Sequence, residues 1–304
     1  MKQSVRLGRV AGIPVGAHWS VAVILAVIAE LLAVTVLPAA FPHEPVALYW
    51  TVAAIAAVLF LVSLAAHELA QAVVARRSNV AVRSITLWML GGVSELEAEP
   101  PSAGADLRIA LAGPAASLAA GGIFLAAGAA ISAAGGPAVA VAAATWLAVT
   151  NGFLAAFNLL PGAPLDGGRV LRALWWRHSG DREHAERVTA RAGRVLGAVI
   201  MGLGAAEFLA LRSANGLWLL LIGWFLVTAA GAEETAAAAK TALAGVRVAD
   251  VMTAHPGAEL VTGAGQAGLA ERIVGMVQAL WLLAVVLSCR FPSRAISGST
   301  AWAS

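Results

Sequence analysis

Residues 47–77 read ALYWTVAAIAAVLFLVSLAAHELAQAVVARR, and the rest of the chain is interpreted from this stretch. Its first part is an uncharged apolar run long enough for a helix that crosses a bilayer. His67 and Glu68 then follow, before the segment ends at Arg76 and Arg77. An ionisable pair within such a run is costly in lipid, so these two side chains are expected to face a polar cavity or a polar partner.

The composition places the whole chain in a membrane. Hydrophobic residues make up 60% of the 304 residues and charged residues only 12%, whereas soluble domains carry about 25% charged residues. The net charge of +3 comes from basic residues that gather between the apolar runs. This distribution is typical of charges that set membrane topology, and it disfavours a nucleic-acid partner. The single cysteine, Cys289, excludes an internal disulfide.

Six apolar runs predict an all-α polytopic membrane protein with six transmembrane helices. The first run is longer than the apolar part of a cleaved signal peptide, so it is interpreted as a retained signal anchor. A further run at 273–288 is shorter than a usual span of about 20 residues, and a short seventh span, a buried helix and an amphipathic segment remain equal alternatives for it. The six predicted spans cover about 19–40, 47–75, 107–134, 138–160, 195–211 and 217–232.

Basic residues predict the orientation of these spans. Segments 1–18, 76–108 and 169–194 contain 3, 4 and 7 Lys or Arg residues, whereas the links 41–46, 134–138 and 212–216 contain 0, 0 and 1. Because cytoplasmic loops are enriched in Lys and Arg, we expect a multi-pass protein of the cell membrane with a cytoplasmic N-terminus. The long polar segment 166–194 is then also cytoplasmic.

A β-hairpin is predicted at the edge of the membrane. Residues 83–90 are too few to span as a helix and are typical of a strand. Gly91 and Gly92 interrupt this strand, and residues 93–99 then alternate apolar and acidic side chains. Paired glycines between two such runs indicate a hairpin with the glycines at its turn.

Two sequence clusters indicate a metal site. In the motif H-E-x-x-H, two His side chains on one helix face bind Zn²⁺ while the Glu acts as general base. Here His67 and Glu68 match, but Gln71 occupies the second ligand position. Residues 158–169, NLLPGAPLDGGR, break the end of the fourth span, and irregular backbone at membrane depth is tolerated only inside protein or beside a watery cavity. An aspartate in such a turn is more often a helix cap, but beside His67 and Glu68 we favour Asp166 as a third ligand.

Together these residues resemble the site-2 protease family of intramembrane zinc metalloproteases, peptidase family M50. The resemblance covers about residues 1–230, and the segment 158–169 is its most specific motif. The other matching segments are His18-Trp19, the His67–Gln71 motif, LWMLGGV at 87–93 and AGPAAS at 112–117.

The resemblance implies a role for each matching residue. His67 is similar to the first zinc ligand, Asp166 to the third, and Glu68 to the general base, while Gln71 stands where the second ligand belongs. The hairpin at Gly91 and Gly92 would present an edge strand to an unwound substrate. Asn158 would engage substrate or orient the site. The implied cofactor is Zn²⁺, and the implied partner is a membrane-protein substrate with a transmembrane segment in the lipid bilayer.

Gln71 leaves three interpretations open, because an amide oxygen is a poorer zinc ligand than imidazole. The protein could be a protease with weakened metal binding, a catalytically dead pseudoprotease that still binds transmembrane segments, or a member of an active lineage that carries this substitution. Reduced metal affinity is the interpretation we favour. A small-solute transporter is disfavoured, because the chain lacks the paired half-helix repeats of many transporters.

The chain is expected to divide into a transmembrane metalloprotease core, 1–232, and a cytoplasmic tail, 233–304. Residues 246–256 of the tail, VRVADVMTAHP, resemble the opening of a CBS domain. The match ends after about ten residues, so we expect the CBS part to be truncated relative to the CBS-bearing subgroup, and nucleotide regulation is unsupported.

Overall fold

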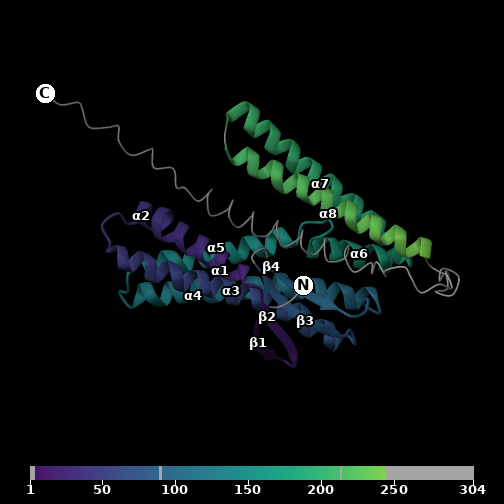
Figure 1. Cartoon of the computed structure of the whole chain (residues 1–304), viewed down its shortest axis with the longest axis horizontal. Coiled ribbons are helices and arrows are strands. Elements are labelled where there is room, and N and C mark those ends of the chain that lie inside the picture. Colours follow the sequence, from purple (N-terminus) through teal and green to yellow (C-terminus); the bar gives the residue numbers. More distant parts are fainter. Residues whose placement is uncertain (1–3, 89–90, 213, 244–304) are drawn as a thin grey trace, which may run out of the picture.

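The computed structural model describes residues 4–88, 91–212 and 214–243. The described chain is mostly helical, with one small sheet beside the helices (Figure 1). The CBS-like segment 246–256, the apolar run 273–288 and Cys289 lie outside the described residues.

Within the described residues, six helices are long and apolar enough to cross a bilayer, which confirms the prediction of six membrane-spanning helices. The first of them has three consecutive parts, α1 (Ser20–Leu31), the π-helical segment η1 (Leu32–Val36) and α2 (Leu37–Ala40). The other five are α3 (Val46–Arg77), α4 (Ala103–Ala133), α5 (Ala138–Asn158), α7 (Arg182–Leu211) and α8 (Ala214–Leu243).

The polar segment 166–194 forms helices rather than an open loop. It folds into α6 (Asp166–Ser179) and the first turns of α7. Gly180 ends α6 in the left-handed conformation at φ +72°, and the Asp181 carboxylate then accepts a hydrogen bond from the His184 N–H at 2.9 Å as the N-cap of α7. The helix that contains the predicted fifth span therefore begins at Arg182, because the charged turns before residue 195 continue the same helix.

Four strands form the sheet in the order β1-β2-β3-β4. They are β1 (Val5–Val10), β2 (Ile13–Ala17), β3 (Val82–Trp88) and β4 (Gly91–Leu96). The strands β1 and β2 were not predicted, and β2 joins the sheet by parallel pairing with β3. The stability of β2 depends on tertiary packing, because Ile13 is buried in one cluster with Ala72 of α3 and Ile85 of β3.

The predicted hairpin is present as β3 and β4, but its glycines are not at the turn. Gly91 pairs with Trp88 and Gly92 pairs with Leu87, so both glycines belong to β4. At residue 92 the reason for glycine is packing against Glu68 of α3.

The helix α3 lies at the centre of the molecule, where it packs against α1, α4, α5 and both strands of the hairpin. The helices α7 and α8 pair with each other, and in Figure 1 this pair lies to one side of the α1–α5 bundle. Phe157 at the end of α5 packs with Ile222 and Phe225 of α8 in a shared apolar cluster. The helix α6 packs against both α4 and α7, and thus links the two parts.

Candidate active site

One face of α3 presents His67 and Gln71, which are four residues apart and therefore neighbours on the helix surface. Their Nε2 atoms lie 3.3 Å from each other, and both side chains are buried. His67 is only 1% exposed although it is part of an apolar span.

Asp166, the first residue of α6, reaches the same point from the other side. Its Oδ2 lies 3.2 Å from His67 Nε2, and its Oδ1 accepts a hydrogen bond from Gln71 Nε2 at 2.8 Å. The structure therefore brings together three predicted site residues that come from two helices distant in the sequence.

The helix α4 packs against this cluster. Ser117 Oγ, which is fully buried, lies 2.9 Å from His67 Nδ1 and shares a hydrogen bond with it. One turn earlier, Gly113 lies so close to the site that a Cβ atom there would overlap His67 Nε2 and Gln71 Nε2. A bond at Nδ1 fixes the ring orientation and leaves Nε2 directed at Asp166.

Glu68, also buried, is held by the hairpin. Ser94 Oγ of β4 donates a hydrogen bond to Glu68 Oε2 at 3.0 Å. Gly92 lies against the same side chain, and a Cβ atom on it would overlap Glu68 Cγ and lie 2.7 Å from Cδ. The absence of a side chain at residue 92 is thus what allows β4 to run beside Glu68.

The segment before α6 explains two further features of the sequence. Asn158 is the last residue of α5, is buried, and donates a hydrogen bond from Nδ2 to the Leu154 carbonyl at 3.0 Å. Gly167 and Gly168 lie directly on the backbone of residues 159–163, which a Cβ atom at either position would overlap. The paired glycines therefore let the first turn of α6 pack tightly enough to present Asp166.

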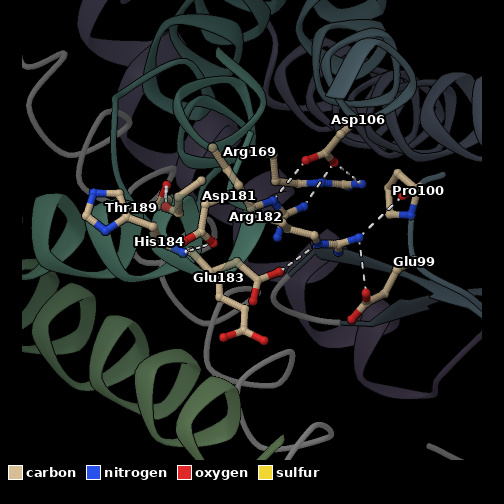
Figure 2. Close-up of polar contacts among 12 residues, drawn as sticks. Glu99, Pro100, Asp106, Arg169, Asp181, Arg182, Glu183, His184 and Thr189 are labelled. Carbon is tan, nitrogen blue, oxygen red and sulfur yellow. Dashed lines mark hydrogen bonds and ion pairs between the residues drawn. The ribbon is translucent and has the colours of Figure 1, made fainter. Parts of the chain in front are cut away.

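A polar pocket of about 610 Å³ lies next to this site, between β4 and the helices α6, α7 and α8. Arg182 at its wall donates to Glu99 and to Glu186, each at 3.0 Å, and to the Pro100 carbonyl at 3.3 Å. Figure 2 shows these contacts and, behind them, the Asp106 carboxylate with arginine side chains of α6. The pocket thus has both signs of charge on its walls.

Two of the three distances among these side chains fit a zinc ion, and the third, 2.8 Å from Gln71 Nε2 to Asp166 Oδ1, is that of a hydrogen bond. Two ligand atoms at about 2.0–2.1 Å from a tetrahedral zinc are about 3.3 Å apart, close to the 3.2 and 3.3 Å that separate His67 Nε2 from Asp166 and from Gln71. Gln71 presents a nitrogen here, and a turn of its amide would present the oxygen instead. Among the described residues, no group of three or more His, Cys, Asp or Glu side chains is placed to hold a metal ion, so the donor set is one imidazole, one carboxylate and one amide.

Three residues in contact with the predicted site residues were not singled out from the sequence, namely Ser94, Gly113 and Ser117. Ser94 lies in the predicted hairpin, and Gly113 and Ser117 lie in the segment 112–117. Only membership of these segments could have indicated a role at the site, because neither serine has a spacing that links it to His67 or Glu68.

Comparisons with known proteins show similarity to metalloproteases. The sequence profile described as peptidase family M50 matches residues 55–139 and 131–202. The chain is 50% identical over 256 residues to Rip3, a candidate zinc metalloprotease of Mycobacterium tuberculosis, an alignment that covers 84% of this chain and 65% of Rip3. It is 32% identical over 240 residues to sll0528, a candidate zinc metalloprotease of Synechocystis, with 79% of this chain and 62% of that protein covered.

The chain thus spans slightly less than two thirds of the length of these two relatives. Among solved structures, the site-2 protease from Methanocaldococcus jannaschii is similar at 27% sequence identity and a TM-score of 0.49, with 83% of this chain and 99% of that chain covered.

Proposed function

The chain belongs to peptidase family M50, and from this premise we propose that it is an intramembrane zinc metalloprotease with a weakened metal site. In this proposal it hydrolyses peptide bonds in or near transmembrane segments of other membrane proteins. The observation that carries the proposal is the convergence of His67, Gln71 and Asp166 within 3.3 Å of one another, with Glu68 adjacent on α3.

The metal ligands are His67, Asp166 and, as a weak third ligand, Gln71. A zinc ion held by them would supply a Lewis acid for the scissile carbonyl and the attacking water. Glu68 is the general base that takes the proton of that water, and Ser94 holds its carboxylate in place. Ser117 keeps the His67 ring in the orientation that directs Nε2 to the ligand position.

The substrate binds as an extended strand along β4. This strand is at the edge of the sheet, where unpaired backbone groups can accept an added strand. The strand β4 begins with Gly91 and Gly92, and the close packing of Gly92 on Glu68 brings the edge of the sheet next to the general base. Asn158, next to the irregular segment before α6, is the third substrate-binding residue in this proposal.

The protein is oriented with its N-terminus in the cytoplasm. Support comes from the basic residues in segments 1–18, 76–108 and 169–194, which the positive-inside rule assigns to the cytoplasmic side. Cleavage would then occur near the cytoplasmic face, because Arg76 and Arg77 end α3 about two turns after His67.

Zinc content of the purified protein in detergent tests the proposal. After dialysis against a chelator, we expect wild-type protein to retain well below one zinc per chain and Gln71→His to retain about one, because imidazole is a far better zinc ligand than an amide. Adding Asp166→Ala to the Gln71→His protein should remove the zinc. Cleavage of a transmembrane peptide by Gln71→His should disappear with Glu68→Gln. If neither wild type nor Gln71→His binds zinc, the proposed site is wrong.

A second candidate function is retention of transmembrane segments without cleavage. The hydrogen bond of 2.8 Å from Gln71 Nε2 to Asp166 Oδ1 favours it, because this bond satisfies the carboxylate without a metal ion. In this case wild-type protein would bind a transmembrane peptide without cutting it at any zinc concentration, and Glu68→Gln would leave the affinity unchanged. Zinc-dependent cleavage by the wild type would exclude it.

A further inference from the structure

We propose that Asp106 on α4 is a positioning residue for Asp166, and that it acts through Arg169 and Arg172 of α6. The inference rests on the proposed function in one respect, namely that Asp166 is a metal ligand. Asp106 itself does not touch the reacting groups, and its effect is transmitted by the placement of α6.

The ion cluster of Asp106, Arg169 and Arg172 is buried and closely paired. Asp106 is 1% exposed and accepts from Arg172 at two points, from Nε to Oδ2 at 2.8 Å and from Nη2 to Oδ1 at 2.9 Å. Arg169 Nη2 adds a longer contact of 3.4 Å to Oδ1 (Figure 2). A bidentate arginine–carboxylate pair fixes direction as well as distance, so it sets the position of α6 relative to α4.

The two arginines belong to the helix that begins with Asp166. They follow it by three and six residues, so the cluster holds the first two turns of α6. On another side of these turns, Gly167 and Gly168 contact the backbone of residues 159–163 without room for a side chain. The start of α6 is therefore held by the ion cluster on α4 and by backbone packing.

The helix α4 also contacts the other half of the site. Asp106, Gly113 and Ser117 are spaced by seven and four residues, which places them along one face of a helix. Gly113 and Ser117 contact His67 and Gln71 of α3, whereas Asp106 contacts α6. One face of α4 thus aligns the helix that carries His67 with the helix that carries Asp166.

The charges of this cluster depend on one another. Burial lowers the pKa of the Arg172 guanidinium, but the hydrogen bonds and charge of Asp106 outweigh it and raise the pKa above its usual value. Arg172 therefore stays charged, and a buried charge without its partner is strongly unfavourable. Loss of Asp106 would force the two arginines toward the polar pocket beside α6, and Asp166 would move with them.

The first test measures zinc affinity in the Gln71→His background, so that the weak ligand does not limit the experiment. We expect Asp106→Asn to weaken zinc binding by roughly 10- to 100-fold, as for residues that support metal ligands elsewhere, and Asp106→Glu to recover part of this loss. An unchanged zinc affinity in Asp106→Asn would overturn the inference.

The second test reports the alignment of α3 and α6 without a metal. In a Cys289→Ser background, Gln71→Cys and Asp166→Cys are linked by a short thiol-reactive cross-linker, and Asp106→Asn should lower the yield severalfold. An unchanged cross-linking yield would contradict the inference, whether or not zinc binds. If the yield falls as expected but zinc does not bind, only the proposed function is contradicted.

A matched control separates positioning from general loss of an ion pair. Glu234→Gln breaks the 2.7 Å pair of Arg194 with Glu234, which joins α7 to α8, and should change neither zinc affinity nor cross-linking. If Asp106→Asn does not fold, as judged by circular dichroism, Arg172→Lys takes its place, because it keeps the charge but loses the bidentate geometry. If Arg172→Lys and Glu234→Gln have the same zinc affinity and the same cross-linking yield, the inference is overturned.

Discussion

At the scale of single residues, Gln71 is the side chain that determines what this site can do. Its amide donates to Asp166 and lies beside His67 Nε2, so the polar groups of the site are already paired without a metal. A zinc ion must compete with that pairing and then accept an amide oxygen in place of an imidazole. Both effects lower the affinity of the site for zinc.

Ser117→Ala tests the support of His67. Loss of the hydroxyl leaves the buried Nδ1 without its partner at 2.9 Å, so zinc affinity in the Gln71→His background should fall by about tenfold or more, and the free energy of unfolding by about 1–3 kcal/mol. Chelator competition and thermal unfolding give the two values. Ser63→Ala is the matched control, because Ser63 is also buried on α3 but bonds only its own helix, at the Phe60 carbonyl. Equal losses of zinc affinity in both variants would contradict the role of Ser117.

Some residues of the candidate site could be predicted from the sequence, and others could not. His67 and Gln71 could be paired from spacing alone, since positions four apart share a helix face. Asp166 was a candidate because its segment breaks a helix at membrane depth. Ser94 and Ser117 gave no comparable signal, because their contacts depend on how β4 and α4 pack against α3, and packing of separate elements is not encoded in a local pattern.

At the scale of elements, β4 is the strand of the sheet that contacts Glu68, the proposed general base. Its glycines looked like a turn in the sequence, because paired glycines are typical of hairpin turns. In the structure both glycines belong to the strand, and Gly92 allows it to approach Glu68. A packing requirement and a turn requirement both select glycine, so the sequence alone could not distinguish them.

Gly92→Ala tests this approach. The added methyl would overlap Glu68 and must displace either the strand or the carboxylate, and a displacement of about 1 Å at a catalytic group costs roughly 100-fold in rate. We expect a loss of that order in peptide cleavage by the Gln71→His protein, with zinc content unchanged. Gly122→Ala on α4, where a methyl meets open space, should cleave normally. Normal cleavage by Gly92→Ala would mean that β4 does not adjoin the working base.

At the scale of the whole molecule, apolar length and basic residues predicted most of the architecture. Six spans could be read from these two quantities because a bilayer imposes a fixed thickness and favours positive charge on one side. The placement of the α7–α8 pair could not be predicted, since it depends on contacts such as Phe157 with Ile222 and Phe225. The strand β2 was missed because it depends on β3, a partner distant in the sequence, and β1 pairs only with β2.

The proposed orientation can be tested with single cysteines in a Cys289→Ser background. Ser179→Cys at the end of α6 and Ala134→Cys at the end of α4 are both at exposed positions, on opposite sides of the membrane according to the distribution of basic residues. In intact cells, a membrane-impermeant thiol reagent should label Ala134→Cys and leave Ser179→Cys unlabelled until the cells are opened. The reverse pattern would place the N-terminus outside.

The separation of His67 from Asp166 by 99 residues also has a consequence for biosynthesis. A ribosome adds about 5–20 residues per second, so α3 emerges about 5–20 s before α6 exists. During that interval the nascent chain holds Glu68 and one imidazole but not the carboxylate that completes the donor set. Under the proposed function, the chain would therefore be unable to hydrolyse peptide bonds while its first four spans enter the bilayer, and the site would be complete only once α6 has been made.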